Sequence, residues 1–275
     1  METTIKFRVN KNESKQSYVG TDLFRIYATK DFALSNGGYV REGAQGGWIE
    51  NESNLDQDGN CWVADGAIVS GNARVLDNAV VSGNSVVSEH ATVSENAVVD
   101  GCSTISGAAA IGGNAVITGG ATVTDCATVT DRAVISGDVS VSGRAMVFER
   151  AVVSGNASVS GMARVLGRAV VSDRADVSGE ATVLDYATIC DCASVSGGVV
   201  VSGHAIVSGQ YFASGRATFS GYEVVPGRKS VPDSAPASPD TTTQESVSVS
   251  GATNCDEDDA QNKVIFCGCG FTPRQ

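Results

Sequence analysis

The chain has 275 residues and a formal net charge of −12; 42% of its residues are hydrophobic but only 6% are aromatic. This length allows one or two domains with a substantial core, which the composition requires to be built from small side chains. Residues 61–225 hold 15 acidic residues, eight arginines and no lysine. The chain therefore lacks the basic stripe of a nucleic-acid-binding protein, and no stretch is long and apolar enough to predict a membrane span.

The first residues, METTIKFRVN, do not show the basic region and apolar run of a signal peptide. Without a secretion signal, the eight cysteines are expected to be thiols rather than a disulfide framework. We therefore expect a cytoplasmic protein.

The N-terminal segment, residues 1–54, differs from the rest of the chain because it has no short repeat. Residues 5–9 alternate apolar and polar side chains, and residues 23–32 form a second β-prone run after a polar turn. A solenoid needs a cap, since its terminal coil would otherwise expose core and unpaired strand edges. We predict that residues 1–54 form a small β cap.

Residues 55–229 contain a six-residue repeat without insertions. At the 26 positions taken in steps of six from Ala67 to Ala217, 21 residues are Ala. Two places after each of these positions, 24 of 26 residues are Val or Ile. Two places further on, the residues are 17 Gly, six Asp and three Glu.

A period of six is incompatible with an α-helix, but it contains the period of two that a β-strand requires. Each repeat therefore predicts a three-residue strand, small-x-Val, whose first and third side chains point inward. Gly or Asp at the next corner tolerates a left-handed backbone. Three repeats close a triangular coil of 18 residues, and coils stack at about 4.8 Å. The prediction is an all-β, single-stranded parallel β-helix.

These repeats resemble the hexapeptide repeat of left-handed β-helix proteins, as in the stretch Val69-Ser70-Gly71-Asn72-Ala73-Arg74. The segment GGWIENESNL at residues 46–55, with the CWV and Ala/Val repeats after it, is similar to the transferase-labelled YdcK-type hexapeptide proteins. The resemblance covers roughly residues 20–225 and implies the left hand of the coil.

Residues 230–275 have a different composition from the repeat. A Pro/Ser/Thr-rich stretch is followed by the acidic NCDEDDAQN, and we expect residues 230–262 to be a disordered linker. The apolar segment KVIFCGCGF near the end is expected to dock on another part of the protein.

The outward side chains form three columns, because residues 18 apart stack in successive coils. We call the first column the polar face; it runs Val86, Thr104, Thr122, Ser140, Ser158, Asp176, Ser194, Phe212. The second, the mixed face, runs from Arg74 to Thr218. The third, the valine face, is apolar almost throughout: Trp62, Val80, Val98, Val116, Val134, Val152, Val170, Thr188, Ile206, Val224.

The corner that leads into the valine face also carries unusual residues. Its first position holds Leu76, Phe148, Leu166 and Leu184, and its third position stacks Arg132, Arg150 and Arg168, followed by Tyr186 and His204. Like charges about 4.8 Å apart repel each other unless they are paired. A high β-propensity of valine alone would place valine on all three faces, so we predict that the valine face and this corner form a subunit interface. The resemblance implies a homotrimer.

Candidate catalytic groups are few. His90 and His204 both occupy corner positions, where turn residues stand in other repeats. The resemblance implies a histidine general base in a cleft between subunits, and His204, beside the valine face, is the candidate for that role. The uninterrupted repeat lacks the extruded loop that helps to form such a pocket.

Metal and cofactor motifs are also missing from the sequence. The pairs Cys190/Cys192 and Cys267/Cys269 are CxC, not the paired CxxC of zinc sites, and no phosphate-binding or hydrolase motif occurs. We predict no metal and no cofactor. The functional hypothesis is a rigid oligomeric scaffold without its own catalytic centre; the alternative is an acyltransferase that uses acyl-CoA or an acyl carrier.

Overall fold

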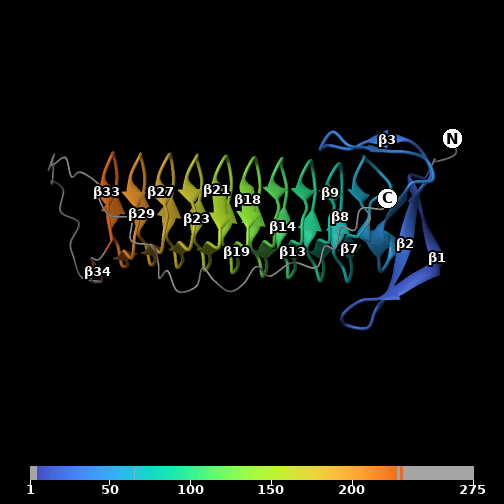
Figure 1. Ribbon diagram of the computed structural model, residues 1–275, viewed down its shortest axis with the longest axis horizontal. Coiled ribbons are helices and arrows are strands. Elements are labelled where there is room, and N and C mark those ends of the chain that lie inside the picture. Colours follow the sequence, from blue (N-terminus) through green and yellow to red (C-terminus); the bar gives the residue numbers. More distant parts are fainter. Residues whose placement is uncertain (1–4, 65, 228–229, 232–275) are drawn as a thin grey trace, which may run out of the picture.

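The computed structural model describes residues 5–64, 66–227 and 230–231. It consists of a row of parallel coils with an antiparallel hairpin at the N-terminal end (Figure 1). The prediction of an all-β parallel β-helix is confirmed. No helix among the described residues is long and apolar enough to cross a membrane.

The first sheet has 13 strands, and its solenoid strands carry the polar face. In spatial order they are β1 (Phe7–Gln16), β2 (Asp22–Ala28), β5 (Gln45–Ile49), β7 (Ile68–Val69), β10 (Val86–Val87), β13 (Thr104–Ile105), β16 (Thr122–Val123), β19 (Ser140–Val141), β22 (Ser158–Val159), β25 (Asp176–Val177), β28 (Ser194–Val195), β31 (Phe212–Ala213) and β34 (Ser230–Val231).

The second sheet has nine strands and carries the mixed face. They are β8 (Arg74–Val75), β11 (Thr92–Val93), β14 (Ala110–Ile111), β17 (Thr128–Val129), β20 (Met146–Val147), β23 (Arg164–Val165), β26 (Thr182–Val183), β29 (Val200–Val201) and β32 (Thr218–Phe219).

The third sheet has ten strands and carries the valine face. They are β6 (Trp62–Val63), β9 (Val80–Val81), β12 (Val98–Val99), β15 (Val116–Ile117), β18 (Val134–Gly137), β21 (Val152–Gly155), β24 (Val170–Val171), β27 (Thr188–Ile189), β30 (Ile206–Val207) and β33 (Val224–Val225). Two smaller elements are the hairpin of β3 (Phe32–Ala33) with β4 (Tyr39–Val40) and the 3₁₀-helix η1 (Glu52–Asn54).

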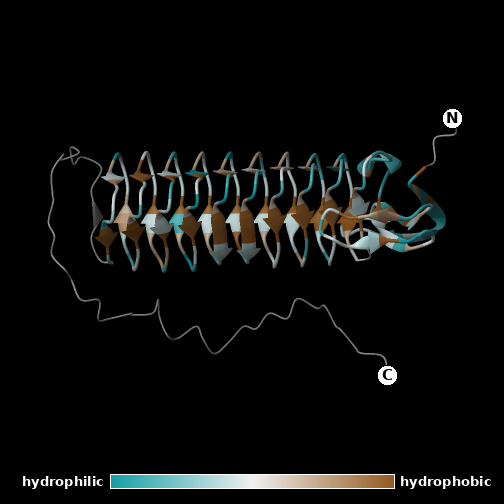
Figure 2. Cartoon of the chain, turned by 90° about the horizontal axis from the view of Figure 1, so that it is seen from above, coloured by the Kyte–Doolittle hydropathy of each residue, from teal (hydrophilic) through white to brown (hydrophobic). Residues whose placement is uncertain are grey.

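The register between coils is 18 residues, as the repeat predicts. Val134 pairs with Val116 on one side and with Val152 on the other. The strands are coloured hydrophobic over much of their length, whereas many corners are hydrophilic (Figure 2). The inward Ala and Val positions before the last coil are buried, for example Ala133 and Ile135 at 0% exposure, so the core is a thin column of small side chains.

The corners have a left-handed backbone. All 26 Gly, Asp or Glu residues at the corner position from Gly71 to Gly221 have a positive φ. The nine non-glycine residues with positive φ are the six Asp and three Glu of this column. An acidic side chain at this position makes a contact that glycine cannot make. Its carboxylate accepts a hydrogen bond from a backbone N–H of the next coil, as Glu89 does from Gly107 at 2.8 Å.

The N-terminal segment covers the first coil. Strand β1 pairs antiparallel with β2, and β2 pairs antiparallel with β5, which then stacks parallel on β7. Gly46 is required here because a Cβ would lie 2.5 Å from the Trp62 ring and 2.6 Å from Ile26. Because β5 stacks parallel on β7, it is the first strand of the solenoid. It begins at Gln45, inside the segment that the sequence predicts as the cap.

Two buried polar side chains complete this end. The Asn54 amide donates to the carbonyl oxygens of Gly71 at 3.0 Å and Ala73 at 2.8 Å. The Lys6 ammonium donates to the Asp58 carbonyl at 3.1 Å and to Cys61 Sγ at 3.1 Å. Burial raises the pKa of the Cys61 thiol. The Lys6 bonds therefore tie the cap to the first coil, and the Asn54 bonds tie η1 to the second coil.

At the other end, the inward column changes from small to aromatic residues. Tyr211 replaces Ala and Phe219 replaces Val, and the two rings meet edge to face at 5.9 Å. Both are buried and fill the last coils. The predicted linker and apolar segment of residues 230–275 lie outside the described residues, except for β34.

Candidate functional site: the valine face and the arginine corner

The valine face is one continuous column of outward side chains. Its rungs pair directly from coil to coil, as Val98 does with Val116 and Val152 does with Val170. From Val98 to Ile206 these side chains are partly exposed, each flanked by its neighbours above and below. A continuous apolar strip is more informative than scattered exposed valines.

The first two rungs are not available to a partner. Trp62 is 3% exposed and Val80 is 1% exposed. The Phe32 ring, from the β3–β4 hairpin, lies edge-on to Trp62 with the ring centroids 5.5 Å apart. The predicted interface residues Trp62 and Val80 are therefore core residues under the N-terminal cap, and the open part of the valine face begins at Val98.

The polar face is not polar over its whole length. Trp48 and Ile68 extend its column at the N-terminal end, where they pair in register. Trp48 is covered by two cations, because the Arg25 guanidinium lies 3.9 Å and the Lys15 ammonium 4.6 Å from its ring centroid. From Thr104 to Ser194 the face is polar, as predicted.

We call the corner beside the valine face, defined by Arg132, Arg150 and Arg168, the arginine corner. These side chains are exposed, whereas the apolar residues at the first corner position, Phe148, Leu166 and Leu184, are partly buried. A shallow groove of about 790 Å³ runs along the corner; its lining is Glu95, Gly113, Asn114, Asp131, Arg132, Glu149, Arg150, Gly167, Arg168, Asp185 and Tyr186.

Among the described residues, no ion pair joins a carboxylate to Arg132, Arg150 or Arg168. Three of the four carboxylates that line the groove are engaged with the backbone instead: Glu95 accepts from the Gly113 amide, Asp131 from Glu149 and Asp185 from Gly203. The Arg168 guanidinium lies 5.5 Å from the Tyr186 ring centroid. The structure thus leaves a column of like charges without carboxylate partners in the described part of its own chain.

The arginine column continues into an aromatic stack. The His204 ring lies between Tyr186 and Tyr222, at centroid distances of 4.9 and 4.8 Å and nearly parallel to both. His204 is exposed, and Tyr222 is 81% exposed. Both ring faces of His204 are therefore covered. Tyr222 was not singled out from the sequence, although it is the next residue of this column.

The second histidine is far less enclosed. His90 lies on the corner between the polar and mixed faces, where its Nε2 is 3.3 Å from the Asn72 amide nitrogen. This contact is one rung of an exposed corner column. It fits the role of a turn residue, which the sequence indicated.

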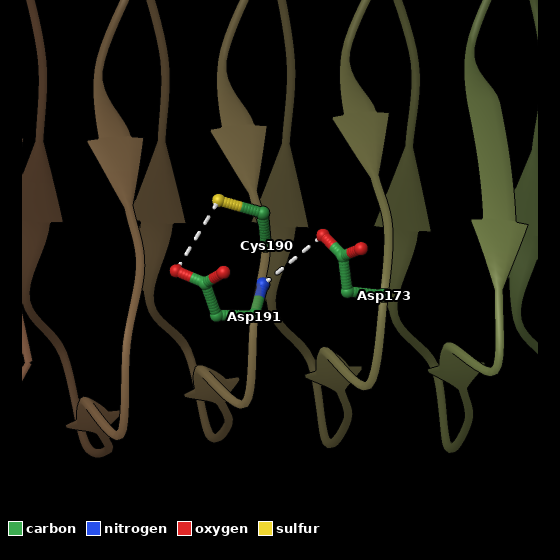
Figure 3. Close-up of side chains that lie close together, drawn as sticks. All are labelled: Asp173, Cys190 and Asp191. Carbon is green, nitrogen blue, oxygen red and sulfur yellow. Dashed lines mark hydrogen bonds between the residues drawn. The ribbon is translucent and has the colours of Figure 1, made fainter. Parts of the chain in front are cut away.

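A third group of side chains lies at the far border of the valine face. The Asp173 and Asp191 carboxylates and the Cys190 thiol each offer an atom within 4.8 Å of the others (Figure 3). Cys190 Sγ lies 4.0 Å from Asp191, and Asp173 accepts from the Asp191 amide at 3.3 Å. Burial, followed by the two carboxylates, raises the pKa of Cys190 to about 11. Both carboxylates occupy the corner position that holds Gly, Asp or Glu in every repeat, so the repeat by itself explains why they lie close together.

This group was not predicted from the sequence, because it joins a cysteine to two aspartates of adjacent coils and matches no cysteine-pair motif. Asp173 and Asp191 are 18 residues apart and therefore occupy one corner column. The second CxC pair, Cys267 and Cys269, lies outside the described residues.

No protein-family model matches the chain. A curated relative, the uncharacterized acetyltransferase YdcK of Escherichia coli strain K12, is 35% identical over 79 residues, which are 26% of this chain and 24% of the relative. The chain thus spans about a quarter of the length of the relative it matches. The six-residue repeat, the parallel coils and this partial similarity together fit a hexapeptide-repeat β-helix protein.

Proposed function

We propose that this protein is a rigid β-helix scaffold that assembles with further copies of itself through the valine face. The observation that carries the proposal is the apolar column on one face, formed by Val98, Val116, Val134, Val152, Val170 and Ile206, in which Thr188 is the one polar residue. The polar face of the same coils carries Thr, Ser and Asp at the equivalent places, from Thr104 to Ser194. This asymmetry is unexpected if valine served only as a strand-forming residue.

The size of the strip indicates that the arginine corner takes part. Seven rungs at about 4.8 Å and a face roughly 10 Å wide give an area of about 300 Å². A standard interface buries about 800 Å² on each partner. The partly buried Phe148, Leu166 and Leu184 extend the apolar surface around the corner. We propose a homotrimer, which is the assembly that the resemblance implies.

The test is a pair of matched variants. Val134→Lys with Val152→Lys places two cations on the valine face, and should convert the assembly to monomers in sedimentation velocity. Ser140→Lys with Ser158→Lys places the same charges on the polar face of neighbouring strands and should leave the assembly unchanged. An assembly that survives the valine substitutions would overturn the proposal.

A second candidate function rests on the similarity to a protein named as an acetyltransferase. In an acyltransferase, His204 would be the general base, and Arg150 and Arg168 on the same corner suit phosphate groups of an acyl donor. The stacking of His204 between two tyrosines leaves only its ring edge for a substrate. In a thermal-shift experiment, CoA and acetyl-CoA should raise the melting temperature of a transferase by mass action and leave that of a scaffold unchanged.

A further inference from the structure

A buried amine–thiol pair lies where the N-terminal segment meets the first coil. The Lys6 ammonium donates to Cys61 Sγ at 3.1 Å, and both residues are 0% exposed. Lysine is almost never fully buried unless it is paired. Among the residues that the structure describes, no carboxylate lies within ion-pair distance of Lys6. Its ammonium also donates to the carbonyl oxygens of Asp58 at 3.1 Å and Gly59 at 3.4 Å. Ion pairing therefore does not account for this burial.

The packing of the coil does not require a cysteine at position 61. Cys61 occupies the inward position that holds Ala in most repeats, directly before strand β6. Its sulfur atom, which Ala lacks, makes the contact with Lys6. The other contacts of the sulfur are longer, to the carbonyl oxygens of Asp56 at 3.5 Å and Asp58 at 3.8 Å. The contact between amine and sulfur is thus specific to this coil.

Gln57 holds the amine side of the pair in place. Its Oε1 accepts from the backbone N–H of Lys6 at 2.7 Å and of Phe7 at 3.3 Å, and its Nε2 donates to the Phe7 carbonyl at 3.1 Å. The backbone at Lys6 is therefore fixed against the first coil. Reacting atoms held about 3–3.5 Å apart are in near-attack geometry, and the Lys6 nitrogen and the Cys61 sulfur, at 3.1 Å, meet this condition.

We propose that Lys6 and Cys61 form a covalent modification site, at which oxidation by hydrogen peroxide joins the two side chains through an S–N bond. In the first step the Cys61 sulfur attacks the peroxide, the O–O bond breaks, and a sulfenic acid forms while water leaves. In the second step the Lys6 ammonium releases one proton to solvent, and its nitrogen attacks the sulfur. The S–OH bond breaks, and the hydroxide leaves as water with a second proton from the nitrogen. Overall the sulfur loses two electrons and the peroxide gains them.

The surroundings favour the amine as the group that captures the sulfenic acid. Among the described cysteines, the next along the chain is Cys102, which lies more than two coils further on. Residues 57–60, two of which contact the ammonium, are exposed, so a small neutral oxidant has one stretch of chain to cross. Burial raises the pKa of the Cys61 thiol, so its oxidation should be slower than that of an exposed thiol. The site should therefore respond to prolonged exposure to peroxide.

The crosslink would lock the N-terminal segment onto the solenoid. It joins residues that are 55 positions apart, so it would close a loop in the unfolded chain and lower its entropy. The oxidised protein should melt about 5–10 °C above the reduced protein, and dithiothreitol should reverse this shift. Neither residue lies on the valine face, so the crosslink is independent of assembly.

Peptide mapping by mass spectrometry, after treatment of the full-length protein with hydrogen peroxide, tests the site. The expected product is a pair of peptides linked between Lys6 and Cys61, about 2 Da lighter than their sum, which dithiothreitol separates. In Lys6→Met, which removes the amine but keeps a long side chain, Cys61 should proceed to sulfinic acid instead. Cys61→Ala introduces the residue common at this position of the repeat, and should abolish both the link and the rise in melting temperature.

The matched control is Cys126→Ala, which removes an exposed thiol more than three coils from Cys61 and should leave the linked pair unchanged. The proposal is wrong if wild-type Cys61 becomes sulfinic or sulfonic acid without a link to Lys6. It is also wrong if Cys61 remains a thiol at every peroxide concentration that the folded protein tolerates. A linked pair about 14 Da heavier than the sum would contain an N–O–S bridge and would overturn the S–N bond.

Discussion

The Asp125 carboxylate accepts a hydrogen bond of 2.9 Å from the backbone N–H of Gly143, 18 residues further along the chain. Asp125 itself has a φ of 59°. One side chain therefore satisfies the corner of the next coil while its own backbone stays in the left-handed region, where most residues are strained. The same relationship recurs at other acidic corners.

Substitutions at Asp125 should separate these two contributions. Asp125→Ala removes the acceptor and keeps the strain, and should destabilise the protein by about 1–2 kcal/mol. Asp125→Gly loses the bond but releases the strain, and should cost less than half as much. Denaturant unfolding followed by circular dichroism measures both. Equal losses for Ala and Gly would show that backbone strain at this corner is unimportant.

Two serines in one inward column should respond in opposite ways to loss of the hydroxyl. Ser103 Oγ donates to the Asp100 carbonyl at 2.8 Å, whereas Ser85 Oγ is buried without a partner in the described part of the chain. Ser103→Ala should lower the free energy of unfolding by about 1 kcal/mol, and Ser85→Ala should raise it by a similar amount. The expectation fails if Ser85→Ala is the more destabilising of the two.

The buried Asn54 amide should be necessary for the N-terminal cap. Its side chain bonds two carbonyl oxygens of the next coil and accepts from the Asn51 amide at 2.7 Å. Asn54→Ala should cost about 2–4 kcal/mol because several buried groups lose their partners together. Hydrogen exchange should then rise first in residues 45–75. Uniform exchange along the solenoid would contradict this local role.

Cys190 should react slowly with iodoacetamide at pH 8. With a pKa of about 11, only about one thiol in a thousand is ionised there, and the rate should rise about tenfold per pH unit up to that value. Asp191→Asn should accelerate the reaction, because it removes a neighbouring negative charge. Peptide mapping by mass spectrometry measures the modified fraction. Alkylation at pH 8 as fast as that of an unfolded peptide would contradict the raised pKa.

The architecture was predictable from the sequence because each repeat carries its own structural information. Ala, Val and Gly or Asp at fixed positions specify strand, inward face and corner, and the observed pairing of Val134 with Val152 follows from the period alone. The cap over Trp62 and Val80 was not predictable in this way. It depends on Phe32 reaching across from a segment without a repeat.

The candidate site was predictable in part. Stacking at 18 residues identified the valine face and the column of Arg132, Arg150 and Arg168. Whether a neighbouring carboxylate pairs with these arginines depends on side-chain geometry at the corner. In the described part of the chain, Asp131 accepts a hydrogen bond from the Glu149 amide instead of pairing with Arg132. Local spacing in the sequence cannot supply that information.

The most direct test of the proposed scaffold is the mass of the full-length protein in solution, measured by sedimentation velocity over a range of concentrations. We predict a species of about three times the chain mass of 28.1 kDa, which the Val134→Lys and Val152→Lys double variant should lose. A wild-type protein that sediments as a monomer at every concentration would contradict assembly through the valine face.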